Sequence, residues 1–243
     1  MYPSDKEAKA LILSIGKKMS ASGFVTANDG NLTIRVEDDA VWATPTGVNK
    51  GDLTEEMLIK VRISDGAVIE GTWKPTCELV MHLNAYRADN EVMSTAHAHP
   101  LNLCVLACAG IDLDLPTTPA AVCISGKVPV LPYYCSGSPE LAECIIPYVK
   151  KYHVVNLGNH GPIAWGKKPM EAWYRLEDAE ACARLALEIA RLGRFRPLNS
   201  EQCKHVINYH GFEVHPEAYH AAHDGWENQE PGISFTEFMK NRK

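Results

Sequence analysis

Residues 92–100 read VMSTAHAHP. The composition of this run predicts a strand over residues 92–97, which Pro100 ends at an open corner. His97 and His99 are two residues apart, and side chains at that spacing point to the same side of a strand. Two such imidazoles form half of a zinc site, because Zn²⁺ binds neutral ring nitrogens in a tetrahedral arrangement.

His160 is the candidate for a third metal ligand. It lies in the turn 158–161, where Gly158 and Gly161 are expected to let the backbone bend and aim the ring inward. Three histidines leave one coordination position open, as a catalytic zinc requires. The plain alternative is a turn histidine that only binds a carbonyl group, and these residues alone do not decide between the two.

Predicted helices and strands alternate along the chain, both before and after residues 92–100. Helices are predicted over residues 5–22, 78–87, 101–109, 138–151, 169–192 and 199–209. Strands are predicted over residues 31–36, 40–43, 57–63, 67–70, 92–97, 127–131, 154–157 and 162–165. The alternation indicates one α/β domain over residues 1–212, followed by a polar C-terminal extension over residues 213–243 that we expect to pack on its own or a neighbouring subunit.

The composition excludes several classes of protein. The chain has 243 residues, of which 46% are hydrophobic and 22% charged, as in a globular protein and unlike a disordered one. A formal charge of −6 argues against a nucleic-acid partner. The sequence contains no run of about 18 apolar residues, which argues against a membrane span, and its start lacks the features of a signal peptide. The eight cysteines form no CxxC pair, which is typical of reduced thiols and predicts a cytoplasmic protein.

Glu78 is the acid–base candidate. It opens a predicted helix after Pro75, Thr76 and Cys77, where the helix dipole and the free amides favour a carboxylate or an anion. An ordinary first-turn glutamate is the alternative reading of this residue. Three loops rich in small polar residues, at 28–31, 44–47 and 76–77, have the amides and hydroxyls that a phosphate site requires.

Five short motifs in this order resemble the class II aldolase/adducin family, and within it the fuculose phosphate aldolases. They are Gly30-Asn31-Leu32-Thr33, Thr44-Pro45-Thr46-Gly47, Pro75-Thr76-Cys77-Glu78, His97-Ala98-His99 and His160-Gly161. The resemblance runs over residues 5–212. It implies a three-layer α/β/α sandwich with a mostly antiparallel central sheet, assembled as a homotetramer with active sites between subunits.

The same resemblance implies roles for individual residues. His97, His99 and His160 would bind Zn²⁺, with Co²⁺ or Mn²⁺ as alternatives, and Glu78 would be the general acid/base. The substrate phosphate would be held by Asn31, Thr46, Gly47, Thr76 and Cys77. Cys77 replaces the serine usual at its position, and a thiol is a weaker hydrogen-bond donor. Tyr209 matches a family tyrosine that lies over a neighbouring subunit's site.

The resemblance implies a metal-dependent aldolase. Such an enzyme cleaves or forms a ketose-1-phosphate, from dihydroxyacetone phosphate and an aldehyde, through a zinc-stabilised enediolate. A second family tyrosine, which assists proton transfer to the aldehyde oxygen, is missing from residues 116–121.

Other activities of the family remain open on the sequence. A sugar-acid phosphate decarboxylase or a methylthioribulose-phosphate-type dehydratase would use the same metal site. Glu78 stands where the epimerases usually have aspartate, which counts against an epimerase. An adducin-like interaction module without catalysis is less favoured, since such modules lose the metal ligands and the acid/base.

Overall fold

The computed structural model describes residues 1–210 and 233–241, and its centre is an eight-stranded sheet in the order β4-β3-β2-β1-β5-β9-β8-β7. Among these strands every neighbouring pair is antiparallel except β7 with β8. The strands are β1 (Asn31–Glu37), β2 (Ala40–Ala43), β3 (Ile59–Arg62), β4 (Val68–Glu70), β5 (Ser94–His97), β7 (Val130–Leu131), β8 (Val154–Leu157) and β9 (Gly161–Gly166).

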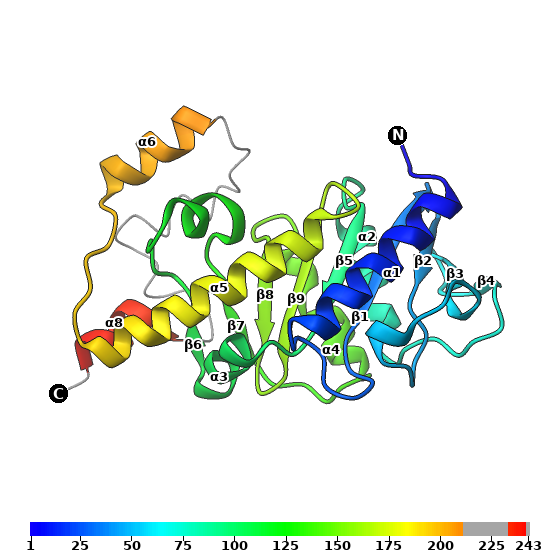
Figure 1. Cartoon of the computed structure of the whole chain (residues 1–243), viewed down its shortest axis with the longest axis horizontal. Helices are drawn as coiled ribbons and strands as arrows, with labels where there is room; N and C mark the ends of the chain where they lie inside the picture. Colours follow the sequence, from blue (N-terminus) through cyan, green and yellow to red (C-terminus); the bar gives the residue numbers. More distant parts are fainter. Residues whose placement is uncertain (211–232, 242–243) are drawn as a thin grey trace.

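Helices cover both faces of the sheet (Figure 1). One face packs against α1 (Asp5–Ala21), α3 (Leu101–Ala109) and α5 (Glu171–Leu192), and the other against α2 (Leu79–Ala88) and α4 (Pro139–Cys144). Consecutive residues of one strand therefore enter different cores, as Val154 and Val155 do, because side chains alternate between the faces of a strand. This confirms the predicted α/β fold with a mostly antiparallel sheet.

The long predicted helices agree closely with the structure, and their ends have physical causes. The Ser4 side chain accepts a hydrogen bond from the Glu7 amide at the start of α1, and the Glu7 carboxylate accepts one from the Ser4 amide, which forms a capping box. At its other end α5 stops at Gly193, which has a φ of 66°, a conformation that glycine adopts without strain. Within the described ranges, no helix combines the length and apolar character needed to cross a membrane.

Two predicted elements are shorter in the structure because of proline. The strand predicted over residues 127–131 is reduced to β7, because Pro129 has no amide hydrogen to give to a ladder. The helix predicted over residues 138–151 ends at Cys144 and continues as the 3₁₀ turn η4 (Ile146–Tyr148), which contains Pro147. Further short elements are η1 (Lys50–Asp52), η2 (Glu55–Met57), the π-helical turn η3 (Ala121–Ser125) and β6 (Ile111–Asp112).

The C-terminal part of the chain adds three elements. The helix α6 (Ser200–His210) packs on η3, where Cys203 is buried against Val122 and Cys123. Residues 233–241 return to the domain: β10 (Ile233–Ser234) pairs in parallel with β6, and α8 (Phe235–Asn241) follows directly. The predicted boundary at residue 212 lies outside the described residues, as does most of the predicted extension.

A buried ion pair lies beside β6, the strand with which β10 pairs. Lys127 Nζ lies 3.1 Å from Asp112 Oδ2, and both side chains are only 2% exposed. Asp112 Oδ1 also accepts the Val130 amide, and the neighbouring carboxylate of Asp114 accepts the Phe235 amide at the start of α8. The ion pair therefore lies within the edge of the domain on which residues 233–241 pack.

We expect the Lys127→Met substitution to lower the free energy of unfolding by about 3–5 kcal/mol, because it leaves the Asp112 carboxylate buried without its cation. Urea denaturation followed by circular dichroism measures the change. The double variant Lys127→Met/Asp112→Leu should regain much of the loss, and Arg62→Met, which breaks an exposed ion pair with Asp65, should change little. A single variant as stable as the wild type would contradict this reading.

Candidate functional site

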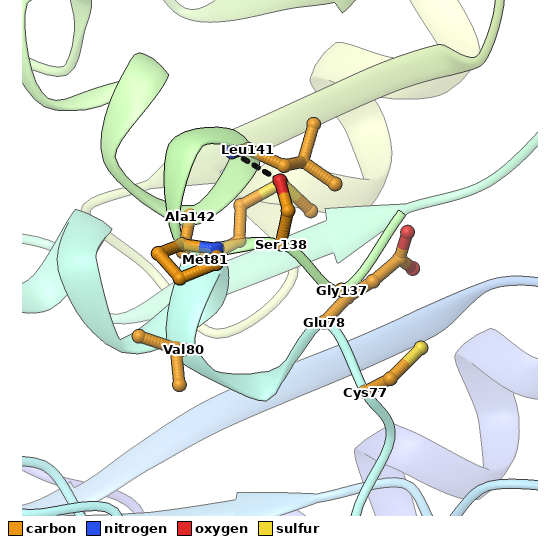
Figure 2. A pocket seen from close by; sticks show the side chains of 9 residues that line it. Cys77, Glu78, Val80, Met81, Gly137, Ser138, Leu141 and Ala142 are labelled. Carbon is orange, nitrogen blue, oxygen red and sulfur yellow. Dashed lines mark hydrogen bonds between the residues drawn. The ribbon is translucent and has the colours of Figure 1, made fainter. Parts of the chain in front are cut away.

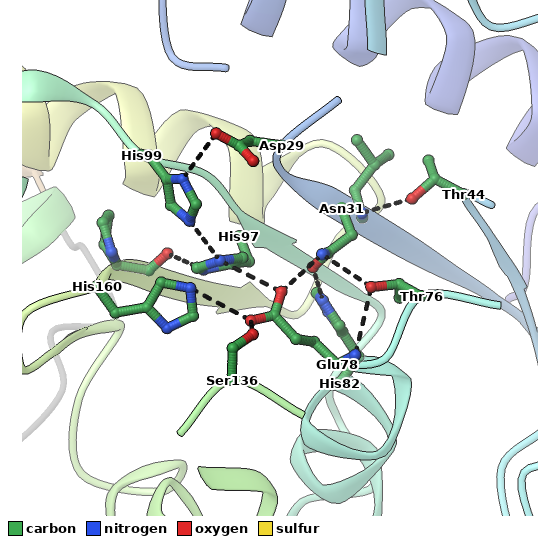
Figure 3. Close-up of polar contacts among 12 residues, drawn as sticks. Asp29, Asn31, Thr44, Thr76, Glu78, His82, His97, His99, Ser136 and His160 are labelled. Carbon is green, nitrogen blue, oxygen red and sulfur yellow. Dashed lines mark hydrogen bonds and ion pairs between the residues drawn. The ribbon is translucent and has the colours of Figure 1, made fainter. Parts of the chain in front are cut away.

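Three histidines converge at the end of the central strands (Figure 3). His97 is the last residue of β5, His99 follows at the corner, and His160 lies in the turn between β8 and β9. The Nε2 atoms of His97 and His99 are 3.1 Å apart. One ring nitrogen from each of the three residues lies within 4.8 Å of the others. The structure thus brings together the three predicted metal ligands.

In the turn that carries His160, other backbone atoms lie so close to Gly158 and Gly161 that neither position has room for a side chain. Neither glycine has the positive φ that would mark it as a bending point. A Cβ at Gly161 would lie 2.7 Å from the Ala98 carbonyl oxygen, and one at Gly158 would lie 2.5 Å from the Leu131 carbonyl oxygen. The positive φ of the turn, 54°, belongs to Asn159, a residue type that tolerates this region. The two glycines are therefore required because β9 and the turn pack directly against neighbouring backbone.

The donor set of the triad fits a divalent metal ion. His97 Nδ1 donates to the Pro162 carbonyl oxygen at 2.9 Å, so its Nε2 keeps a lone pair for a metal. His99 Nδ1 lies 3.3 Å from Asp29 Oδ2, an arrangement that orients the ring in the same way. Two nitrogens bound to one tetrahedral zinc would be about 3.3 Å apart, close to the separation between His97 and His99.

Burial keeps two of the three histidines, His97 and His160, in the neutral form that binds metal. His97 is fully buried, and desolvation lowers its pKa to about 3, although the nearby Glu78 acts in the opposite direction. The pKa of His160 is lowered for the same reason. Both imidazoles are therefore neutral at neutral pH, and neutral imidazole is the metal ligand.

Glu78 reaches the triad from the start of α2. Its side chain is 7% exposed, with Oε2 3.5 Å from His97 Nε2 and Oε1 3.3 Å from His160 Nε2. Two hydrogen bonds hold the carboxylate: the Asn31 amide donates to Oε2 at 2.9 Å and the Ser136 hydroxyl donates to Oε1 at 2.8 Å. The predicted acid/base candidate thus lies beside the metal-binding cluster.

The environment keeps Glu78 ionised. Burial by itself raises the pKa of the carboxyl group, but His97, the Asn31 amide, His160 and the Ser136 hydroxyl together lower it to about 2. Because His97 is neutral at neutral pH, the hydrogen bonds from Asn31 and Ser136 are the contacts that stabilise the charged form there. The free site therefore combines neutral imidazoles with one carboxylate.

The three loops predicted to hold a phosphate lie together. Residues 44–47 meet residues 75–77 through a bridge between Pro45 and Pro75, and the Thr46 amide donates to the Lys74 carbonyl oxygen at 3.0 Å. Asn31 Nδ2 donates to Thr76 Oγ1 at 3.2 Å, which joins the third loop to them.

Open space lies beside these loops. Gly47 has a φ of 79°, and a Cβ built there would meet no atom within 4 Å. Cys77 is exposed, and together with Glu78 it lines a cavity of about 160 Å³ between the starts of α2 and α4 (Figure 2). The loops are therefore accessible from the side where Glu78 approaches the histidines.

Tyr209 is placed apart from this cluster. It is 76% exposed on α6, which stands away from the strand ends that carry the triad (Figure 1). Its ring contacts His205 on the same helix. Within one chain, the described structure does not bring Tyr209 to Glu78.

Two residues that shape the site were not among the predicted ones. His82 is fully buried on α2 and contacts Asn31, and Ser136, in the segment after β7, binds Glu78. His82 is four residues after Glu78, and that spacing on a helix was a signal that both face the same side. Ser136 carried no such signal, because its contact joins residues 58 positions apart.

Known proteins resemble this chain in sequence and structure. A model of the class II aldolase and adducin N-terminal domain matches residues 10–187. A 3-oxo-tetronate 4-phosphate decarboxylase of Pectobacterium atrosepticum is 37% identical over 186 residues, which are 75% of this chain and 84% of that protein. An L-fuculose phosphate aldolase of Methanocaldococcus jannaschii is 32% identical over 179 residues, which are 74% of this chain and 95% of that protein.

A solved structure gives the same result. A protein of Klebsiella pneumoniae, described as an aldolase/epimerase/decarboxylase, matches with a TM-score of 0.78 and 30% identity over 84% of this chain and 99% of its own. The family match and the three converging histidines identify a metal-dependent lyase with decarboxylases and aldolases among its relatives. The chain therefore belongs to the class II aldolase and adducin family.

Proposed function

We propose that the protein is a decarboxylase of 3-oxo sugar acid phosphates, with 3-oxo-tetronate 4-phosphate as the reference substrate. The observation that carries this proposal is the ionised Glu78 within 3.5 Å of two histidines of an open metal-binding triad. Such a site favours loss of a group next to a ketone. The relative of Pectobacterium atrosepticum, 37% identical, supports carboxylate as that group.

His97, His99 and His160 would hold the metal ion, for which we propose Zn²⁺, with Co²⁺ or Mn²⁺ as alternatives. When bound, such an ion supplies a Lewis acid that withdraws electrons from a ketone oxygen. Burial keeps His97 and His160 neutral, and contacts with the Pro162 carbonyl group and with Asp29 orient His97 and His99 respectively.

Glu78 would manage the proton that the reaction consumes. The bond between the carboxylate carbon and the hydroxyl-bearing carbon breaks, and carbon dioxide leaves. The hydroxyl-bearing carbon takes a proton in place of the lost carboxylate. Glu78 is ionised in the free site, so it must first gain this proton from water. The substrate carboxylate would assist by placing a second negative charge nearby, which raises the pKa of Glu78.

The neighbouring loops would hold the substrate phosphate through Thr46, Gly47, Thr76 and Cys77. Asn31 would contribute by positioning Thr76, to which its amide nitrogen donates. Thr76 Oγ1 accepts hydrogen bonds from Asn31 Nδ2 and from the Glu78 amide, and neither bond uses the hydroxyl hydrogen. That hydrogen is available to a phosphate oxygen. The open space at Gly47 permits close approach to its backbone.

Cleavage of a ketose-1-phosphate by an aldolase mechanism is the second candidate. The relative of Methanocaldococcus jannaschii, 32% identical over 95% of its length, supports this reading. Against it, residues 116–121 read PTTPAA, without the tyrosine that sugar-phosphate aldolases of this family use on the aldehyde oxygen. A dehydratase would use the same metal ligands, but no relative considered above points to it.

A homotetramer is part of the proposal because of Tyr209. Its exposure on α6 suits a residue that acts on a neighbouring subunit, where it would cover the site or assist proton transfer. A module without catalysis is disfavoured, because the three histidines and Glu78 are all present and assembled.

Incubation of the zinc-loaded protein with 3-oxo-tetronate 4-phosphate should release carbon dioxide and dihydroxyacetone phosphate in equal amounts. Coupled assays for both products measure the reaction, and L-fuculose 1-phosphate serves as the parallel aldolase substrate. Dihydroxyacetone phosphate from the second substrate alone would reject the decarboxylase in favour of the aldolase.

The Glu78→Gln substitution should lower kcat by about 10²–10⁴-fold, because the amide cannot carry the proton. Zinc content should stay close to that of the wild type, since Glu78 is not one of the three ligands. Glu140→Gln, at an exposed position on α4, is the control and should leave kcat unchanged. Turnover by Glu78→Gln at the rate of the wild type would remove Glu78 from the mechanism.

Removal of one ligand should empty the metal site. The purified protein should contain about one zinc ion per chain, and His97→Ala or His160→Ala should lose it on dialysis against a weak chelator, together with activity. His205→Ala, at an exposed histidine of α6, is the control and should keep its metal. Elemental analysis by mass spectrometry measures the zinc content per chain. Full zinc occupancy in His97→Ala would refute the proposal that the three histidines bind the metal.

A further inference from the structure

A row of buried polar residues runs behind Glu78, between the sheet and α2. Asn31 and Thr33 on β1 are the register partners of His97 and Thr95 on β5. The residues between them, Leu32 and Ala96, enter the core on the opposite face. Asn31, Thr33, Thr95 and His97 therefore lie on the face of the sheet that α2 covers.

Hydrogen bonds connect this row to α2. His82 Nε2 contacts Asn31 Oδ1, and His82 Nδ1 lies 2.5 Å from Thr95 Oγ1. Thr33 Oγ1 lies 2.6 Å from Thr95 Oγ1 and also 2.6 Å from the Tyr86 hydroxyl. All five residues are at most 5% exposed, so an unpaired polar atom in the row would be costly.

The contacts of the Asn31 amide nitrogen set the direction of the first bonds in the row. Asn31 Nδ2 donates to Glu78 Oε2 at 2.9 Å and to Thr76 Oγ1 at 3.2 Å. The oxygen of Asn31 then faces His82 and can only accept, which places the single ring proton of His82 on Nε2. Burial lowers the pKa of His82 to about 4 and keeps this ring neutral.

The remaining bonds follow in the same direction. His82 Nδ1 has no proton and accepts from Thr95, whose hydroxyl oxygen then accepts from Thr33. Because the hydrogen of Thr33 is used, the Tyr86 hydroxyl is the donor, and its hydrogen is shared between Thr33 Oγ1 at 2.6 Å and the Thr33 carbonyl oxygen at 3.1 Å. The bonds thus run one way from Tyr86 to Glu78.

We propose that His82 is a positioning residue for the reaction: through its Nε2 proton it holds the Asn31 amide with its nitrogen toward Glu78. This inference rests on the proposed function. With Asn31 reversed, its oxygen would face the Glu78 carboxylate, and two acceptors would repel each other. His82 therefore orients the hydrogen bond that holds Glu78 beside the triad.

Two substitutions at the same position separate this role from packing. Glutamine can place an amide donor near the former Nε2 position, whereas leucine fills the space without any donor. With 3-oxo-tetronate 4-phosphate as substrate, His82→Leu should lower kcat per bound zinc roughly 10- to 100-fold, with a much smaller change in KM. His82→Gln should recover most of kcat. Dividing kcat by the zinc content corrects for any misfolded protein. The proposal would be overturned if His82→Leu and the wild type had equal kcat values per bound zinc.

Nuclear magnetic resonance of the zinc-loaded wild-type protein, labelled with ¹⁵N-histidine, tests the hydrogen-bond direction without catalysis. His82 should be neutral with its proton on Nε2 across the neutral pH range, and the resonance is assigned by its loss in His82→Gln. A proton on Nδ1, or a charged ring, would reject the proposed direction even if the kinetics agreed. If the wild type does not decarboxylate the substrate, the proposed function fails while this spectrum still decides the role of His82.

Discussion

The register between β1 and β5 is the constraint on which the site depends. It pairs Asn31 with His97 and Thr33 with Thr95, so the residue that holds Glu78 lies next to a metal ligand. The pairing of β5 with β9 places His97 opposite Ile163, a few residues after His160. A slip of one residue would turn these polar side chains into the opposite core, which is filled by Leu32, Ile34 and Ala96.

This constraint has an energetic cost, because the polar row lies where a sheet normally packs apolar side chains. The hydrogen bonds among Thr33, Thr95, His82 and Asn31 offset the loss of water. The apolar residues of α2 and of the strands around them supply the packing on the same face. Because each polar side chain in the row is hydrogen-bonded, we expect the row to be rigid. Such rigidity would help to keep the Glu78 carboxylate beside His97 and His160.

Much of this arrangement follows from local sequence. The hairpins of β1 to β4 and the long helices show the expected periodicities, and the short spacing of His97 and His99 already indicates a metal site. What the sequence does not reveal depends on tertiary contacts. Ser136 reaches Glu78 from the segment after β7, and β10 adds to β6 across more than a hundred residues. No periodicity links such distant segments. The effect of Pro129 on β7 depends on which backbone amides of the strand donate hydrogen bonds to the neighbouring strand, and this follows from the pairing and not from the local sequence.

The choice between decarboxylation and aldol cleavage then depends on what surrounds a shared centre. Both reactions leave an electron pair on the carbon next to a ketone, so both need the triad and a proton carrier such as Glu78. They differ in the leaving group: an aldehyde oxygen must exchange a proton as it leaves, whereas carbon dioxide leaves without one. This chain has the triad and Glu78, which both reactions need, and has no tyrosine within residues 116–121, which is why the proposed function favours loss of carbon dioxide.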